Sequence, residues 1–143
     1  ETSYSHKRDT IEKIDNEAGL NIHEVLEYLD FKNYKEDIEK YEVSNFFKEK
    51  IKKMFEMPFM EDISNSKVYK EFEFYDNESH GIMDLLIEKE DKFIIVDYKL
   101  KNIDEEYYIE QINGYIDYLK KITSKDIEGY LYSIIESRYK KIK

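Results

Sequence analysis

Apolar residues recur along the chain with a helical period first and a strand period later. A helical stripe begins near Asn16 and is formed by apolar residues mostly three or four positions apart: Leu20, Ile22, Val25, Leu26 and Leu29. Asp15 or Asn16 is placed to cap this helix. Residues 1–14 show no strong period and predict a lead-in arm.

A second helical period runs from Tyr34 to Phe55, as one helix or two short ones, and Met57–Pro58 ends it. A polar linker, Glu61 to Ser66, follows. Three strands are then predicted: 68–75, 81–87 and 93–99. A charged turn, Glu88 to Lys92, joins the second of these strands to the third.

The helical period returns from Asp104 to Lys121, with acidic residues in the first turn, where the helix dipole favours them. A further strand is predicted from Ile127 to Ile135, parallel to Phe93–Lys99, because a helix of this length usually connects parallel strands. The fold class is therefore α/β, with a mixed β-sheet flanked by α-helices. The 143 residues fit one domain.

Composition narrows the chemistry. The chain has no cysteine, so disulfides and thiolate metal sites are excluded, and any metal must have oxygen and nitrogen ligands. No apolar run approaches the ~20 residues that span a membrane, and no signal peptide opens the chain, so we expect a cytoplasmic protein without a membrane partner. A formal net charge of −10 argues against gripping DNA by bulk positive charge.

Charged residues interrupt two strands that are otherwise apolar. The strand Phe93–Lys99 is apolar on both faces for four residues, which marks it as buried, and then it ends in Asp97-Tyr98-Lys99. Alternation places Asp97 and Lys99 on one face, about 6.6 Å apart along the strand. If the two strands pair through the charged turn, Asp84 on the preceding strand lies near the same end.

Two buried carboxylates side by side repel each other, and a divalent cation relieves that repulsion. Mg²⁺, with Mn²⁺ as a substitute, prefers carboxylate oxygens, waters and a substrate phosphate. Lys99 could then orient the attacking water and stabilise charge in the transition state. The alternative is that Asp97–Lys99 is a structural ion pair and Asp84 a core carboxylate with its hydrogen bonds satisfied.

Three motifs in this region resemble those of RecB/AddA-type nuclease domains of the PD-(D/E)XK superfamily. The family's G-x-x-D, D-Y-K and Q-x-x-x-Y motifs match, in order, Gly81-Ile82-Met83-Asp84, Asp97-Tyr98-Lys99 and Gln111-Ile112-Asn113-Gly114-Tyr115. Upstream, Ala18 to Phe31 is similar to the AddA helix that supplies a histidine ligand. The resemblance covers about Gly19 to Ile134 and implies a restriction-endonuclease-like core.

The resemblance also implies a metal site. His23, Asp84 and Asp97 would be ligands of Mg²⁺, and the backbone carbonyl of Tyr98 would add another. Taken alone, His23 on the edge of an apolar stripe is more often a packed core histidine.

Catalytic roles follow from the same resemblance. Lys99 would be the catalytic lysine, and Gln111 and Tyr115, one helical turn apart, would position DNA or the lysine and water network. Glu71 resembles a strand acid found before G-x-x-D and is assigned an accessory role. The alternative for Tyr115 is ordinary core packing.

The function implied is a metal-dependent deoxyribonuclease that hydrolyses phosphodiester bonds of single-stranded DNA or duplex ends. It would be the exonuclease part of a bacterial ATP-dependent helicase/nuclease for double-strand-break repair and recombination, in a chain fused to a UvrD-like helicase and working with a second subunit. The main alternative is a catalytically silent module that binds DNA or a partner. Cas-associated nucleases carry cluster cysteines that this chain lacks, and an acidic interaction protein is the remaining interpretation.

Overall fold

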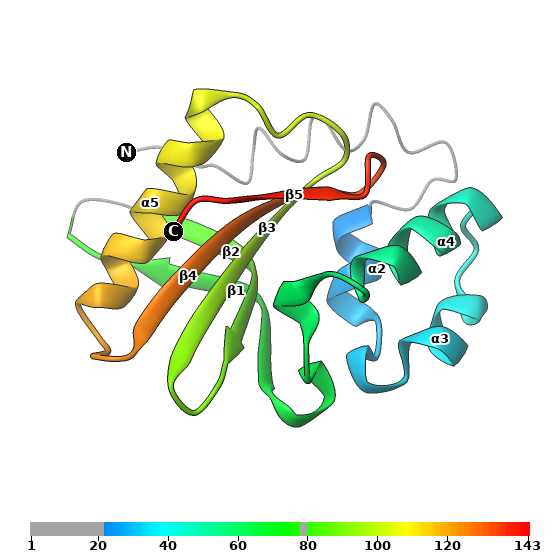
Figure 1. Ribbon diagram of the computed structural model, residues 1–143, viewed down its shortest axis with the longest axis horizontal. Coiled ribbons are helices and arrows are strands. Elements are labelled where there is room, and N and C mark those ends of the chain that lie inside the picture. The colour runs from blue at the N-terminus through cyan, green and yellow to red at the C-terminus, as the bar shows by residue number, and fades with distance from the viewer. Residues whose placement is uncertain (1–21, 78–79) are drawn as a thin grey trace.

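Five strands, in the order β1-β2-β3-β4-β5, form one mixed sheet in the computed structural model, which describes residues 22–77 and 80–143 (Figure 1). The strands are β1 (Lys67–Tyr75), β2 (His80–Glu88), β3 (Lys92–Lys99), β4 (Asp126–Ser133) and β5 (Arg138–Lys141). All neighbours are antiparallel except β3 and β4, which are parallel as predicted. The α/β class and the mixed sheet are confirmed, and the sheet with its flanking helices is consistent with a restriction-endonuclease-like core.

Helices cover both faces of this sheet (Figure 1). They are α2 (Ile22–Tyr28), α3 (Tyr34–Asp37), α4 (Asn45–Met54) and α5 (Glu106–Lys120), with short 3-10 turns at Phe31–Asn33, Ile38–Lys40, Pro58–Met60 and Ile63–Asn65. α5 packs on one face with an apolar cluster that includes Ile95, Ile112 and Leu131. The segment from α2 to the last 3-10 turn packs on the other face, against Leu85 and Val96. The sheet therefore separates two apolar cores.

The helical period over 34–55 forms two helices rather than one. Tyr41 has an extended backbone, and Ser44 begins α4 by accepting a hydrogen bond from Phe47 N on its side-chain oxygen, at 3.3 Å. An N-cap of this kind satisfies one of the free N–H groups at the start of a helix. The predicted start of the first helix near Asn16 and the lead-in arm lie outside the described residues.

Three expectations need correction. The polar linker contains a 3-10 turn that buries Ile63, because Asp62 adopts the left-handed conformation that aspartate tolerates and turns the chain inward. The fourth strand ends at Ser133 rather than Ile135, since the chain turns there towards β5. β5 itself was not predicted, because Arg138–Lys141 is a short basic edge strand without an apolar period.

No helix within the described ranges is both long enough and apolar enough to cross a membrane.

The contact between α5 and β4 requires a glycine, which gives a stability prediction. A Cβ at Gly129 would lie 2.7 Å from Ile112 Cγ2 and 3.2 Å from Ile116 Cδ1. We expect Gly129→Ala to lower the free energy of unfolding by about 1–3 kcal/mol, as overpacking does. Urea denaturation measures this change. The matched control is Gly114→Ala on α5, where nothing lies within 4 Å and alanine favours the helix by about 1 kcal/mol. Shifts of the same sign would contradict the packing argument.

Candidate metal and catalytic site

The regular pairing of β2 with its two neighbouring strands is interrupted at Asp84. β2 and β3 pair from Glu88–Phe93 to Leu85–Val96, and the next positions in this register are Asp84 and Asp97. On the other side, the β1–β2 register passes from Lys70–Leu85 to Phe72–Met83 without pairing Glu71 with Asp84. Glu71 has a φ of 50°, which few non-glycine residues adopt. At Asp84, therefore, the pairing of β2 with β3 ends and its pairing with β1 is interrupted for one position.

This interruption makes the strands change face. Val68 packs in the core beneath α2, whereas Phe72 packs in the core beneath α5, although both positions are even-numbered. An uninterrupted strand would keep them on one face. On β2, Leu85 likewise packs in the core beneath α2, whereas Met83 packs in the core beneath α5. Asp84 therefore sits where the two cores meet and where side chains from both layers can reach one point.

The carboxylate of Asp84 replaces backbone hydrogen bonding that the sheet lacks at this position. Its Oδ2 accepts a hydrogen bond from the backbone N–H of Tyr98 at 2.8 Å, and His23 Nε2 lies 3.1 Å from the same oxygen. Asp84 and His23 are both buried. The structure thus brings His23, on α2, to the predicted carboxylate on β2. The group of Tyr98 that contacts Asp84 is its backbone N–H. The role of the Tyr98 carbonyl as a metal ligand stays a prediction.

Asp97 and Lys99 meet on the side of β3 that faces α5. Lys99 Nζ lies 2.8 Å from Asp97 Oδ2 as an ion pair, and within the described residues neither oxygen of Asp97 has a hydrogen-bond partner of regular geometry. Burial raises the pKa of Asp97 to about 6; Lys99 opposes this rise and the negative charge of Asp84 adds to it. Asp97 is therefore a buried carboxylate that more positive charge would stabilise.

The ammonium of Lys99 has two further neighbours on α5. Lys99 Nζ donates to Gln111 Oε1 at 3.0 Å and lies 4.1 Å from the centre of the Tyr108 ring. Burial opposes the charge on Lys99, but the attraction of Asp97 outweighs it and raises the pKa of Lys99. Of the two roles predicted for Gln111, the structure shows its contact with the lysine, and the positioning of DNA stays a prediction. Tyr108 was not among the predicted site residues, because the helical period places it on the apolar face of α5. Its spacing of three residues from Gln111 was the available signal, since residues so spaced lie on one face of a helix.

Tyr115 and Glu71 complete the predicted set. Tyr115 is buried, and its phenol donates to the carbonyl of Ile82 at 2.8 Å, so it anchors the start of β2 two residues before Asp84. Glu71 is half-buried, opposite Asp84 in the register. Burial is the main cause of the raised pKa of the Tyr98 phenol, followed by the charges of Asp84 and Glu71. The charge of Glu71 therefore acts on the same part of the site as that of Asp84.

The donor set can be tested against a divalent cation. Among the described residues, no three histidine, aspartate or glutamate side chains form a ready-made metal site. His23 and Asp84 contact each other, and Asp97 is paired with Lys99. The chemistry nevertheless fits Mg²⁺ or Mn²⁺, because two neighbouring buried carboxylates, one with both oxygens lacking regular hydrogen bonds, are the ligands these ions prefer. The roles of these residues as ligands stay predictions.

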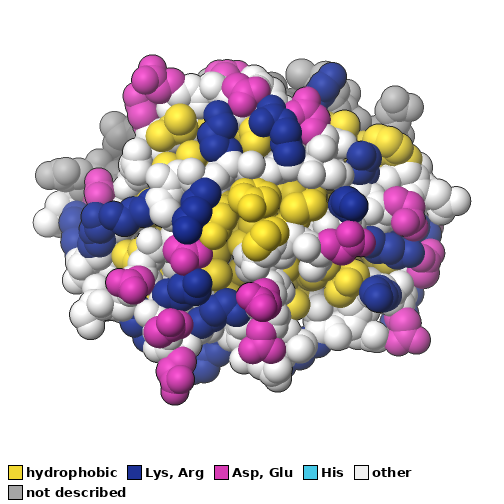
Figure 2. Space-filling model, viewed as in Figure 1, with side chains coloured by type: hydrophobic (Ala, Val, Ile, Leu, Met, Phe, Trp, Pro, Cys, Tyr) yellow, Lys and Arg dark blue, Asp and Glu magenta, His cyan; other side chains and the backbone are white. Residues whose placement is uncertain are grey.

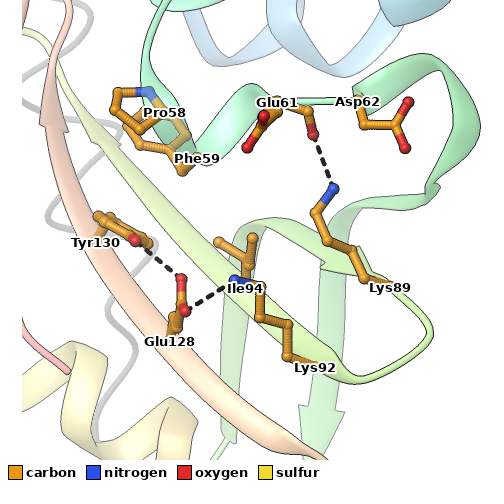
Figure 3. A pocket seen from close by; sticks show the side chains of 9 residues that line it. All are labelled: Pro58, Phe59, Glu61, Asp62, Lys89, Lys92, Ile94, Glu128 and Tyr130. Atoms are coloured by element: carbon orange, nitrogen blue, oxygen red, sulfur yellow. Dashed lines mark hydrogen bonds and ion pairs between the residues drawn. The ribbon is translucent and has the colours of Figure 1, made fainter.

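A cavity of about 760 Å³, lined by described residues, lies elsewhere, near the opposite end of β3 (Figure 3). Lys92 Nζ donates to Glu128 Oε2 at 3.0 Å, and the Tyr130 phenol donates to Glu128 Oε1 at 2.9 Å. Lys89 Nζ donates to the carbonyl of Glu61 at 2.8 Å. Both lysines of this cavity therefore have hydrogen-bond partners within the protein.

Fold and site together define an α/β protein whose sheet is consistent with a restriction-endonuclease-like core, with two aspartates and a lysine gathered on the neighbouring strands β2 and β3. Comparison with known proteins relates the chain to part of the A-type subunit of ATP-dependent helicase/nucleases. Those from Clostridium perfringens (strain SM101) and Clostridium botulinum (strain Okra) are 36% identical to it over 100 and 99 residues, or 61% of this chain. That from Clostridium novyi (strain NT) is 31% identical over 122 residues, or 71%.

The matched region is a small part of these relatives. It spans 8% of the first two proteins and 10% of the third. No family model matches the chain. The comparisons therefore concern a helicase/nuclease-related region and do not assign an activity to it.

The raised pKa of Asp97 predicts a pH dependence of stability in EDTA. Between the usual carboxyl pKa of 3.8 and about 6, the folded state keeps a proton that the unfolded state has lost. Stability should therefore fall as pH rises through this window. We expect this fall in the free energy of unfolding of the wild type relative to Asp97→Asn, measured by urea denaturation from pH 4 to 7. A constant difference across that range would show that Asp97 has an ordinary pKa.

Proposed function

We propose that this chain is a divalent-metal-dependent deoxyribonuclease domain of the PD-(D/E)XK superfamily, which hydrolyses phosphodiester bonds. The observation that carries the proposal is the meeting of Asp84, Asp97 and Lys99 at the point where the pairing of β2 with β3 ends and its pairing with β1 skips one position. Two carboxylates and a lysine gathered at one place in a sheet can hold a cation and a phosphate together. The names of the relatives, which are helicase/nuclease subunits, support a nuclease-related role.

His23, Asp84 and Asp97 would hold Mg²⁺ or Mn²⁺, with the Tyr98 carbonyl as a further ligand. When bound, such an ion acidifies a water and neutralises charge on the phosphate. Asp97 contributes a buried carboxylate, and a positive charge beside it would stabilise its ionised form. The Tyr98 N–H fixes the orientation of Asp84 by its hydrogen bond to Oδ2.

Lys99 would stabilise the negative charge that grows on the phosphate oxygens during the reaction. Its ammonium is already held beside Asp97 by Gln111, so the enzyme does not need to reorganise it. Tyr115 fixes the position of β2 next to Asp84. Glu71, at the same break in the sheet, would act as an accessory acid.

Tight binding of DNA would require help from other parts of a longer chain. The net charge is −10, and Figure 2 shows acidic and basic side chains interspersed around an apolar centre. Phosphate binding needs clustered positive charge. We infer that a helicase domain in the same chain, with a second helicase/nuclease subunit, delivers DNA ends during double-strand-break repair in a bacterial cytoplasm.

One observation favours the alternative of a catalytically silent module. His23 with Asp84, and Lys99 with Asp97, form contacts that satisfy part of the buried charge without a metal. A module that only binds DNA or a partner would retain these contacts for stability.

Cleavage of end-labelled single-stranded DNA separates the two interpretations. With Mg²⁺ or Mn²⁺ we expect the wild type to cut, and Lys99→Ala to lose at least about a hundredfold in rate, as removal of transition-state charge stabilisation does. Lys92→Ala is the matched control, since Lys92 also pairs with a carboxylate but lies at the far cavity. Cutting by Lys99→Ala at the wild-type rate would remove Lys99 from the mechanism, and no metal-dependent cutting by any variant would favour the silent module.

Metal binding should depend on pH, because only ionised carboxylates bind the cation. Below about pH 6, where Asp97 is protonated, we expect the Mn²⁺ affinity to fall by about tenfold per pH unit. Calorimetric titration of the protein with MnCl₂ between pH 5 and 8 measures this. Asp84→Asn should bind weakly at every pH, whereas Asp126→Asn, on an exposed residue, should behave as the wild type. Equal affinity at pH 5 and 8 would exclude Asp97 as a ligand.

A further inference from the structure

We propose that Tyr108 is a positioning residue for Lys99, its ring face forming one wall of the site that fixes the lysine ammonium. The proposal rests on the nuclease function proposed above. Lys99 Nζ contacts groups of three kinds: the carboxylate of Asp97 at 2.8 Å, the amide oxygen of Gln111 at 3.0 Å and the Tyr108 ring at 4.1 Å.

The ring occupies a position where water would otherwise solvate the ammonium. The side chain of Lys99 is 7% exposed, and Tyr108 is buried at 4%. An aromatic face attracts a cation through its quadrupole, and the attraction is stronger when water is excluded. Tyr108 therefore offers the buried ammonium a favourable contact without a negative charge that would bind Lys99 in competition with a phosphate.

Tyr108 and Gln111 act from one rigid element. They are three residues apart on α5, so both face β3. Tyr108 lies in the first turn of the helix, where its N–H donates to the carbonyl of Glu105 at 3.1 Å. The lysine side chain has several rotatable bonds and loses much freedom when it is held in place. Two contacts from one helix, together with Asp97, limit it to one position.

A positioning role predicts a loss of turnover rather than of substrate binding. Lys99 would act mainly on charge that develops in the transition state, so its displacement should lower kcat and leave KM nearly unchanged. We expect Tyr108→Leu to lower kcat by about tenfold, the order expected for loss of a desolvated cation–π contact. Tyr108→Phe keeps the ring face and should retain kcat within about twofold of the wild type on the same grounds.

A second readout does not depend on activity or on metal. Protons above an aromatic face are shifted upfield by the ring, so NMR of protein with ¹³C-labelled lysine should show upfield ε-protons for Lys99, identified by their disappearance in Lys99→Arg. We expect the upfield shift in the wild type and in Tyr108→Phe, and a normal shift in Tyr108→Leu. Unchanged Lys99 ε-protons in Tyr108→Leu would overturn the proposal.

Leu119→Ala controls for simple destabilisation. Leu119 lies on α5 in the same apolar cluster, roughly 16 Å along the helix from Tyr108, and it is buried. This variant should lose stability and keep both kcat and the Lys99 shift. An equal loss of kcat in Leu119→Ala would also overturn the positioning role. If the wild type cuts no DNA, the proposed function fails, and the NMR shift alone decides whether the Tyr108 ring positions Lys99.

Discussion

The site depends on one buried carboxylate that replaces a stretch of sheet pairing. Where the pairing of β2 with β3 ends, the backbone of Tyr98 would lose a hydrogen-bond acceptor in a region that water does not reach. A buried N–H without a partner is costly, and Asp84 Oδ2 supplies the acceptor. The same oxygen contacts His23 on α2. Asp84 therefore closes the break in the sheet and connects it to the helical layer with one side chain.

A carboxylate in that position changes the electrostatics of its neighbours. Burial and the charge of Asp84 both disfavour ionisation of Asp97, and Lys99 offsets only part of this effect, as the pKa of about 6 indicates. Lys99 in turn stays charged because Asp97 is close to it. Breaking one partner from such a buried pair is far more costly than its net contribution to stability. The ionisation of Asp97 and that of Lys99 are thus coupled, and the charge of Asp84 acts on both.

The sequence predicted those parts of the site that rest on regular geometry. β3 is uninterrupted, so alternation correctly placed Asp97 and Lys99 on one face, and the short turn before β3 correctly set the register that leads to Asp84. The change of face at Glu71 could not be predicted, because the register is the same on both sides of it and the apolar positions read as one regular strand. The contact of Tyr108 with Lys99 also required the structure, since it depends on how α5 lies against β3.

In the proposed nuclease, the charges of the site explain how a protein with a negative net charge can bind a phosphodiester. With neutral His23, the two aspartates and Lys99 carry one net negative charge when all are ionised. A divalent cation changes this to one net positive charge, and the single negative charge of a phosphodiester then balances it. Without Lys99 the loaded site would be neutral and would attract the phosphate less. Local positive charge at the reacting phosphate is therefore compatible with a net charge of −10, which repels DNA elsewhere on the surface.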